Sequence, residues 1–215
     1  MSDTLIRTET KPGGGGRDIS HDDFGGFGGG GGDGGGEGSF ETARVGLWVL
    51  MGSLTMLFAA FTSAYLVRRT ASDWSPIQVP SILWLNTMVL LASSATMELA
   101  RSSFRQWRPL AFRKWLLATF VLGALFLAGQ VLAWRELAAQ GVYLDSNPHS
   151  SFFYVLTGVH GVHLLAGIIA LFYALSQSLH YRLTPGESHA PSLCATYWHF
   201  VDGLWIYVFA VLFLW

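Results

Sequence analysis

Charged residues and cysteine are scarce in this sequence. Asp, Glu, Lys and Arg make up 13% of the 215 residues, whereas hydrophobic residues make up 51%. This composition is too apolar for a soluble domain and leaves room for several membrane spans. The formal net charge is -1, and the basic residues are confined to tails and loops, which is not the pattern of a nucleic-acid-binding protein. We therefore expect an integral membrane protein with no nucleic-acid partner.

The sequence also lacks the motifs of several enzyme classes. Its single cysteine, Cys194, excludes an internal disulfide and any CxxC metal or redox motif. It has no GxSxG elbow, no HExxH and no phosphate-binding glycine loop ahead of a basic residue. It also has no inverted repeat, which disfavours a small secondary transporter. We expect no active site and no metal site within this chain.

Glycine is concentrated in one segment. Residues 1–40 include the run GGFGGGGGDGGGEG, which is too poor in apolar side chains to offset the entropy lost on ordering. We predict a disordered tail over residues 1–40 and a membrane domain over residues 41–215. The alternative is that His21, Phe24 and Phe27 dock onto a partner.

Long apolar runs make up the rest of the chain. A hydrocarbon core of about 30 Å needs about 20 helical residues, and five runs meet this requirement, so we predict an all-α bundle of five transmembrane helices. The first run carries small residues at helical spacing, which predicts close approach of another helix. The runs cover approximately residues 45–67, 82–100, 115–134, 151–177 and 193–215, and the small residues of the first are Gly52, Ser53, Ala60, Ser63 and Ala64.

Basic residues are unevenly divided between the two sides. The segment 101–114 is rich in Arg and Lys, the segment 178–192 carries Arg182, and with five spans both share a side with the N-terminus and Arg44. By the positive-inside rule, the N-terminus is expected to be cytoplasmic and the C-terminus outside.

Two pairs of ionisable residues stand three apart in otherwise apolar spans. His160 and His163 share a face of the fourth span, and His199 and Asp202 share a face of the fifth. Polar groups at membrane depth need partners, so these faces should point into protein. We interpret Asp202 as the partner of His199. The residues expected in internal polar packing, or in contact with a partner subunit or lipid, are His160, His163, Trp198, His199, Asp202, Glu98 and Gln130.

These polar residues leave three chemical interpretations open. Glu98 lies three residues before Arg101, which favours a locally paired carboxylate near the membrane surface, and Gln130 is the deepest strongly polar group of the third span. His163 and His199 are predicted at similar depth, as a pair of haem ligands would be. A complete proton pathway would need more ionisable groups than these spans carry. The third interpretation is therefore that these groups support a proton pathway beside another subunit.

Two motifs carry a resemblance to a known family. The stretch FFYVLTGVHGVHLLAG, residues 152–167, and the stretch YWHFVDGLWIYVF, residues 197–209, are together specific. With weaker matches from Arg44 onward, the chain resembles subunit III of the haem-copper oxidases, the cytochrome c oxidase and quinol oxidase family. It resembles the five-span form of that family.

The resemblance implies a non-catalytic subunit of a bacterial inner-membrane oxidase. Such a subunit carries no haem or copper, packs against the catalytic subunit I within a complex that includes subunit II, and binds phospholipid in its helical cleft. It helps sustain proton uptake and the lifetime of the complex. Two acidic positions of the family are replaced here by Leu54 and Ala133. The alternatives are a quinol oxidase subunit, a homologue associated with nitric oxide reductase, and a free-standing membrane haem protein.

Overall fold

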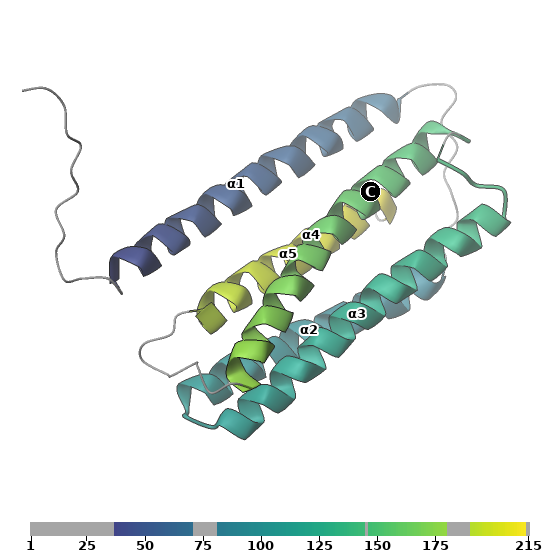
Figure 1. The fold of residues 1–215 in the computed structure, drawn as a ribbon. Helices are drawn as coiled ribbons and strands as arrows, with labels where there is room; N and C mark the ends of the chain where they lie inside the picture. Colours follow the sequence, from purple (N-terminus) through teal and green to yellow (C-terminus); the bar gives the residue numbers. More distant parts are fainter. Residues whose placement is uncertain (1–36, 71–80, 145, 180–189, 214–215) are drawn as a thin grey trace, which may run out of the picture. The chain divides into compact units, whose positions relative to one another are not determined.

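The described residues form five helices and no strand. The structure is a computed structural model that describes residues 37–70, 81–144, 146–179 and 190–213, with side chains from residue 41 onward. All five helices are long and apolar enough to cross a membrane, which confirms the predicted all-α class. In chain order (Figure 1) they are α1 (Glu37–Arg68), α2 (Ser81–Arg105), α3 (Pro109–Ala139), α4 (Pro148–Leu179) and α5 (Ala190–Phe213).

The predicted tail lies almost entirely outside the described residues. Residues 1–36 are not described, and α1 begins at Glu37, inside the segment that we had assigned to the tail. Each helix begins earlier than predicted, and the first four also continue further, because the sequence criterion follows only the apolar part of a helix. The ends of the helices are polar turns that the apolar pattern does not reveal.

Turn and cap residues set the ends of α3 and α4. Pro109 opens α3 in the first turn, where a missing N–H costs nothing. Beyond its last turn, Gly141 has a φ of 77°, and the N–H of Val142 donates to the carbonyl of Leu137 at 3.0 Å. This is the glycine-terminated cap expected after a helix. Asn147 caps α4, because its Oδ1 accepts from the N–H of Ser150 at 3.0 Å.

Helices α2 to α5 make a closed set of contacts. α2 packs on α3, α3 on α4, α4 on α5, and α5 returns to α2, whereas α1 contacts only α4 and α5. The interior is filled by large side chains that are no more than 1% exposed, among them Phe126, Phe153, Leu164, Trp198 and Trp205.

The face with which α1 packs differs from the one predicted. The small residues Gly52, Ser53, Ala60, Ser63 and Ala64 are exposed, and no heavy atom would lie within 4 Å of a Cβ at Gly52. The buried face is instead a line of bulky side chains: Met51, Leu54, Phe58 and Tyr65. A stripe of small residues permits close approach, but the apolar area of large side chains determines which face is buried. Leu54 is part of that face.

Candidate functional site: polar groups between the helices

Among the described helices, α2 and α3 form the most extensive contact. Asn86 is 4% exposed, and its Nδ2 donates to the carbonyl of Phe126 at 3.5 Å. A Cβ at Gly129 would collide with the amide group of Asn86. Glycine at 129 is therefore what allows a polar side chain of α2 to reach the backbone of α3.

Two buried tryptophans of α5 are held by hydroxyls of α2. The Nε1–H of Trp198 donates to Ser93 Oγ at 3.2 Å, and that of Trp205 donates to Thr87 Oγ1 at 3.1 Å. The Trp198 ring fills a slot beside Gly123, where a Cβ would lie 2.7 Å from it. Each indole thus buries a large apolar surface and satisfies its one donor.

His163 faces α1. Its Nδ1 lies 2.7 Å from the carbonyl oxygen of Val159, one turn earlier in α4. Its ring packs edge-on against Phe58 with centroids 6.4 Å apart, and its backbone carbonyl accepts from the hydroxyl of Tyr197 at 3.0 Å. The residue thus helps to join α1, α4 and α5.

His160 occupies a different environment, although it is only three residues away. It is fully buried between aromatic rings, with centroids 5.0 Å from Trp205 and 5.9 Å from Phe126. Within the described part of the chain, its ring nitrogens make no hydrogen bond, and the same holds for the side chains of Gln130 and Asp202. These three residues place buried polar atoms on α3, α4 and α5.

His199 faces α2. Its Nδ1 lies 2.7 Å from Ser94 Oγ, and its Nε2 lies 3.4 Å from a carboxylate oxygen of Glu98. Glu98 also pairs with Arg101 at 3.6 Å, one turn further along α2. Asp202, which we had interpreted as the partner of His199, does not bond to it: the imidazole turns outward to α2, while Asp202 points inward and is 3% exposed.

The two histidines considered as a haem pair face different helices. His163 contacts Phe58 of α1 and His199 contacts Ser94 of α2, and α1 and α2 make no contact with each other. The fold therefore does not bring these imidazoles together. No group of three His, Cys, Asp or Glu side chains that could hold a metal ion occurs among the described residues.

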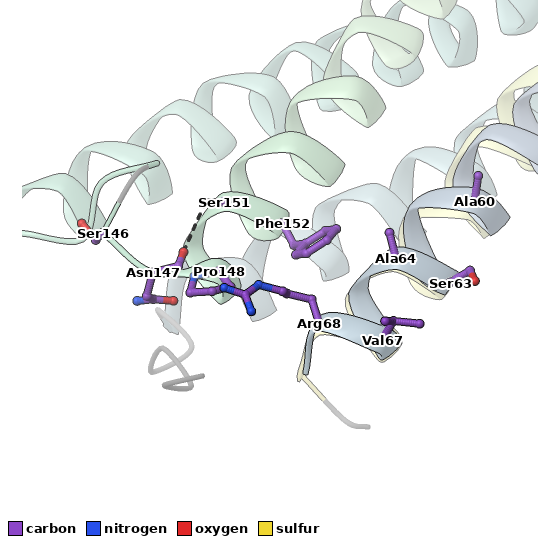
Figure 2. A pocket seen from close by; sticks show the side chains of 10 residues that line it. All are labelled: Ala60, Ser63, Ala64, Val67, Arg68, Ser146, Asn147, Pro148, Ser151 and Phe152. Carbon is purple, nitrogen blue, oxygen red and sulfur yellow. Dashed lines mark hydrogen bonds between the residues drawn. The ribbon is translucent and has the colours of Figure 1, made fainter. Parts of the chain in front are cut away.

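An open pocket of about 1210 Å³ lies where the end of α1 meets the start of α4. Figure 2 shows Arg68 extending from α1 toward Pro148, with Phe152 beside them. The exposed small residues Ala60, Ser63 and Ala64 line this pocket, together with Val67, Ser146, Asn147 and Ser151. A second, nearly apolar pocket of about 400 Å³ lies further toward the start of α1, between that helix, α4 and α5.

The polar residues of α2 are the part of this site that sequence reasoning left without a role. Asn86 and Ser93 are seven residues apart, as are Thr87 and Ser94, and residues at this spacing share a helix face. That face bonds to α3 through Asn86 and to α5 through the three hydroxyls. The spacing was visible in the sequence, but the helices facing it were not.

Comparison with known proteins identifies the chain's family. The family model described as "Cytochrome c oxidase subunit III" matches residues 40–215, which include all of α2 to α5 and most of α1. A probable cytochrome c oxidase subunit 3 of Nocardia farcinica is 33% identical over 174 residues, covering 79% of this chain and 86% of the relative. The cytochrome c oxidase subunit 3 of Corynebacterium diphtheriae is 30% identical over 177 residues, with the same coverage. That of Thermostichus vulcanus is 32% identical over 178 residues.

These matches define a multi-pass membrane subunit of a haem-copper oxidase. The chain belongs to the cytochrome c oxidase subunit III family. Membership confirms the resemblance found in its two motifs and makes it one component of an oxidase complex with other subunits.

Proposed function

We propose that this chain is the accessory subunit III of a bacterial respiratory cytochrome c oxidase. It packs against the catalytic subunit I within a complex that includes subunit II, stabilises that complex and supports its proton uptake, while haem and copper are bound by the partner subunits. The family match over residues 40–215 carries this proposal. The use of Trp198, Trp205 and Asn86 in joining helices supports a role in packing.

The orientation of the chain is part of the proposal. α2 ends and α3 begins in a group of basic residues: Arg101, Arg105, Arg108, Arg113 and Lys114. Basic residues are retained on the cytoplasmic side of bacterial membranes. We place this end, and with it the start of α1, in the cytoplasm of a bacterium with the chain in the inner membrane.

Purification of the tagged full chain from its native membranes tests the assignment. In mild detergent, it should co-purify with a large multi-span protein and a haem absorbance band, and a tagged unrelated membrane protein from the same cells should not. Co-purification of a cytochrome c-binding subunit would establish cytochrome c as the electron donor. Co-purification of a quinol-oxidising complex would contradict the assignment to a cytochrome c oxidase. Recovery of the chain alone would overturn the accessory role. A haem band in the chain alone would instead support a free-standing haem protein.

Bound phospholipid is the second part of the proposal. The pocket in Figure 2 combines apolar walls with the guanidinium of Arg68 at its rim, which suits an anionic headgroup above acyl chains. The nearly apolar second pocket suits an acyl chain. Both pockets are lined by α1 and α4, where the small residues of α1 leave space that bulkier side chains would fill.

Native mass spectrometry of the purified chain tests the lipid assignment. Ala60→Trp would fill the pocket of Figure 2, whereas Ala59→Trp adds the same ring at the neighbouring exposed position outside its lining. We expect retained phospholipid in the wild type and in the Ala59→Trp variant, and its loss in Ala60→Trp. Equal retention in both variants would refute the lipid site.

A further inference from the structure

A line of exchangeable groups leads from the flank of α2 into the interior of the chain. It begins with Arg101 and Glu98, 3.6 Å apart, and continues from Glu98 to His199 Nε2 at 3.4 Å. From His199 Nδ1 it passes to Ser94 Oγ at 2.7 Å. The line alternates between α2 and α5, so it exists only when these two helices are packed together.

From Glu98 onward, burial increases along this line. The side chain of Glu98 is 56% exposed and that of His199 is 36% exposed. Asp202, one turn further along α5, is 3% exposed. The Ser94 hydroxyl lies near its carboxyl, but neither carboxyl oxygen makes a hydrogen bond within the described residues. The line thus connects a half-exposed carboxylate with a buried one.

We propose that Asp202 is a proton-binding site and that Glu98, His199 and Ser94 are the path by which its proton is exchanged. An isolated carboxylate in an apolar interior is far more costly than the neutral acid. Ionisable residues at membrane depth are retained where protons or ions are handled. Asp202 meets this description, because it is buried and neither of its carboxyl oxygens makes a hydrogen bond in the described structure.

Each transfer along the path conserves protons. A neutral carboxylic acid at Glu98 gives its proton to His199 Nε2 while the Nδ1 proton passes to Ser94 Oγ. The hydroxyl rotates and gives its own proton to a carboxylate oxygen of Asp202. Glu98 ends as a carboxylate, Asp202 ends as a neutral acid, and His199 remains neutral with its proton on the other nitrogen. No oxidant, reductant or further reactant is needed.

Few other titratable groups face this region of α5. From α4, the His160 ring packs against the Trp205 ring at a tilt of 42°, and His163 Nδ1 lies beside the Val159 carbonyl of its own helix. From α2 the charged groups are Glu98 and Arg101. The contacts of α5 with α1 and α3 that the described residues show are apolar or hydroxyl contacts. His163 is therefore a suitable control for a histidine outside the path.

Infrared spectroscopy of the full chain in nanodiscs tests the proposal without reference to any partner subunit. At neutral pH, a protonated-carboxyl band should be present in the wild type and absent in Asp202→Asn. On transfer to D2O, the band should shift as the proton exchanges. Ser94→Ala should slow that shift on the order of 100-fold, the scale of a lost positioned proton-transfer group. Ser94→Thr, which keeps the hydroxyl, and His163→Phe should exchange like the wild type.

His199→Phe should slow exchange as Ser94→Ala does. If His199→Phe does not fold, Glu98→Gln at the exposed end of the path provides the same measurement. Absence of the Asp202 band in the wild type, or equal exchange in Ser94→Ala and wild type, would overturn the proposal. Neither result depends on co-purification with an oxidase, so the path and the accessory role fail separately.

Discussion

The glycines of α3 provide a direct test of how closely the helices pack. At Gly129, an added methyl group would collide with the Asn86 amide, which is buried and bonded to Phe126. At Gly123, it would lie 2.7 Å from the Trp198 ring, which Ser93 holds in place. Neither neighbour can move without breaking a hydrogen bond between helices. Alanine at either position should therefore destabilise the fold.

The expected magnitude follows from two opposing effects. Adding a methyl group to a filled interior costs about 1 to 3 kcal/mol. Replacing glycine with alanine inside a helix contributes up to about 1 kcal/mol in the other direction. We therefore expect Gly129→Ala and Gly123→Ala to lower the free energy of unfolding by about 1 to 2 kcal/mol.

Gly46 and Gly52 of α1 supply matched controls. No heavy atom lies within 4 Å of a Cβ built at either position. Gly46→Ala and Gly52→Ala should be neutral or raise the free energy of unfolding by up to about 1 kcal/mol. Equilibrium unfolding of the full chain in mixed micelles, followed by tryptophan fluorescence, would measure all four variants. If Gly129→Ala were as stable as Gly52→Ala, the close contact between α2 and α3 would be refuted.

Three other side chains have measurable roles. Trp205→Phe should lower the free energy of unfolding by at least about 0.6 kcal/mol, which is an average for hydrogen bonds between helices in membranes. A double-mutant cycle with Thr87→Val should show coupling between the two positions, and additive effects would contradict the hydrogen bond. Tyr197→Phe removes the hydrogen bond to the His163 carbonyl and should lower the free energy of unfolding by a similar amount in the same assay. An unchanged midpoint of unfolding would contradict this role. Arg113→Gln should weaken the joining of α3 and α4 at their shared end, seen as faster backbone hydrogen exchange there; unaltered exchange would argue against it.

The fold was predictable because the spans are long and nearly free of charge. In lipid, a helix is the one way for a single segment to satisfy all its backbone groups, so an apolar run specifies its own structure. Contacts between helices are not specified in this way. The stripe of small residues on α1 illustrates the limit, because it was predicted to pack against a helix and is instead exposed, with Ala60, Ser63 and Ala64 lining a pocket.

The polar site was predictable only in part. His199 and Asp202 share one helix face by spacing, and local reasoning therefore paired them. The structure shows that a partner on α2 can reach His199 more favourably than a neighbour on the same helix. Ser94 is 105 residues away in sequence, and no local pattern can indicate such a contact.

The contact between α2 and α5 also has a consequence for how the chain is made. α2 is synthesised before α5, and Thr87 is 118 residues ahead of Trp205 in the sequence. The hydrogen bond between them can therefore form only after α5 has been made. During that interval the Thr87 hydroxyl is occupied by the carbonyl of Leu83, and that of Ser93 by the carbonyl of Leu90. Each hydroxyl is therefore hydrogen-bonded within α2 before α5 is present. It can later accept a hydrogen bond from an indole N–H while it keeps its own bond to the carbonyl. α5 closes the set of contacts, so a chain truncated before α5 would leave the polar face of α2 without its partner helix.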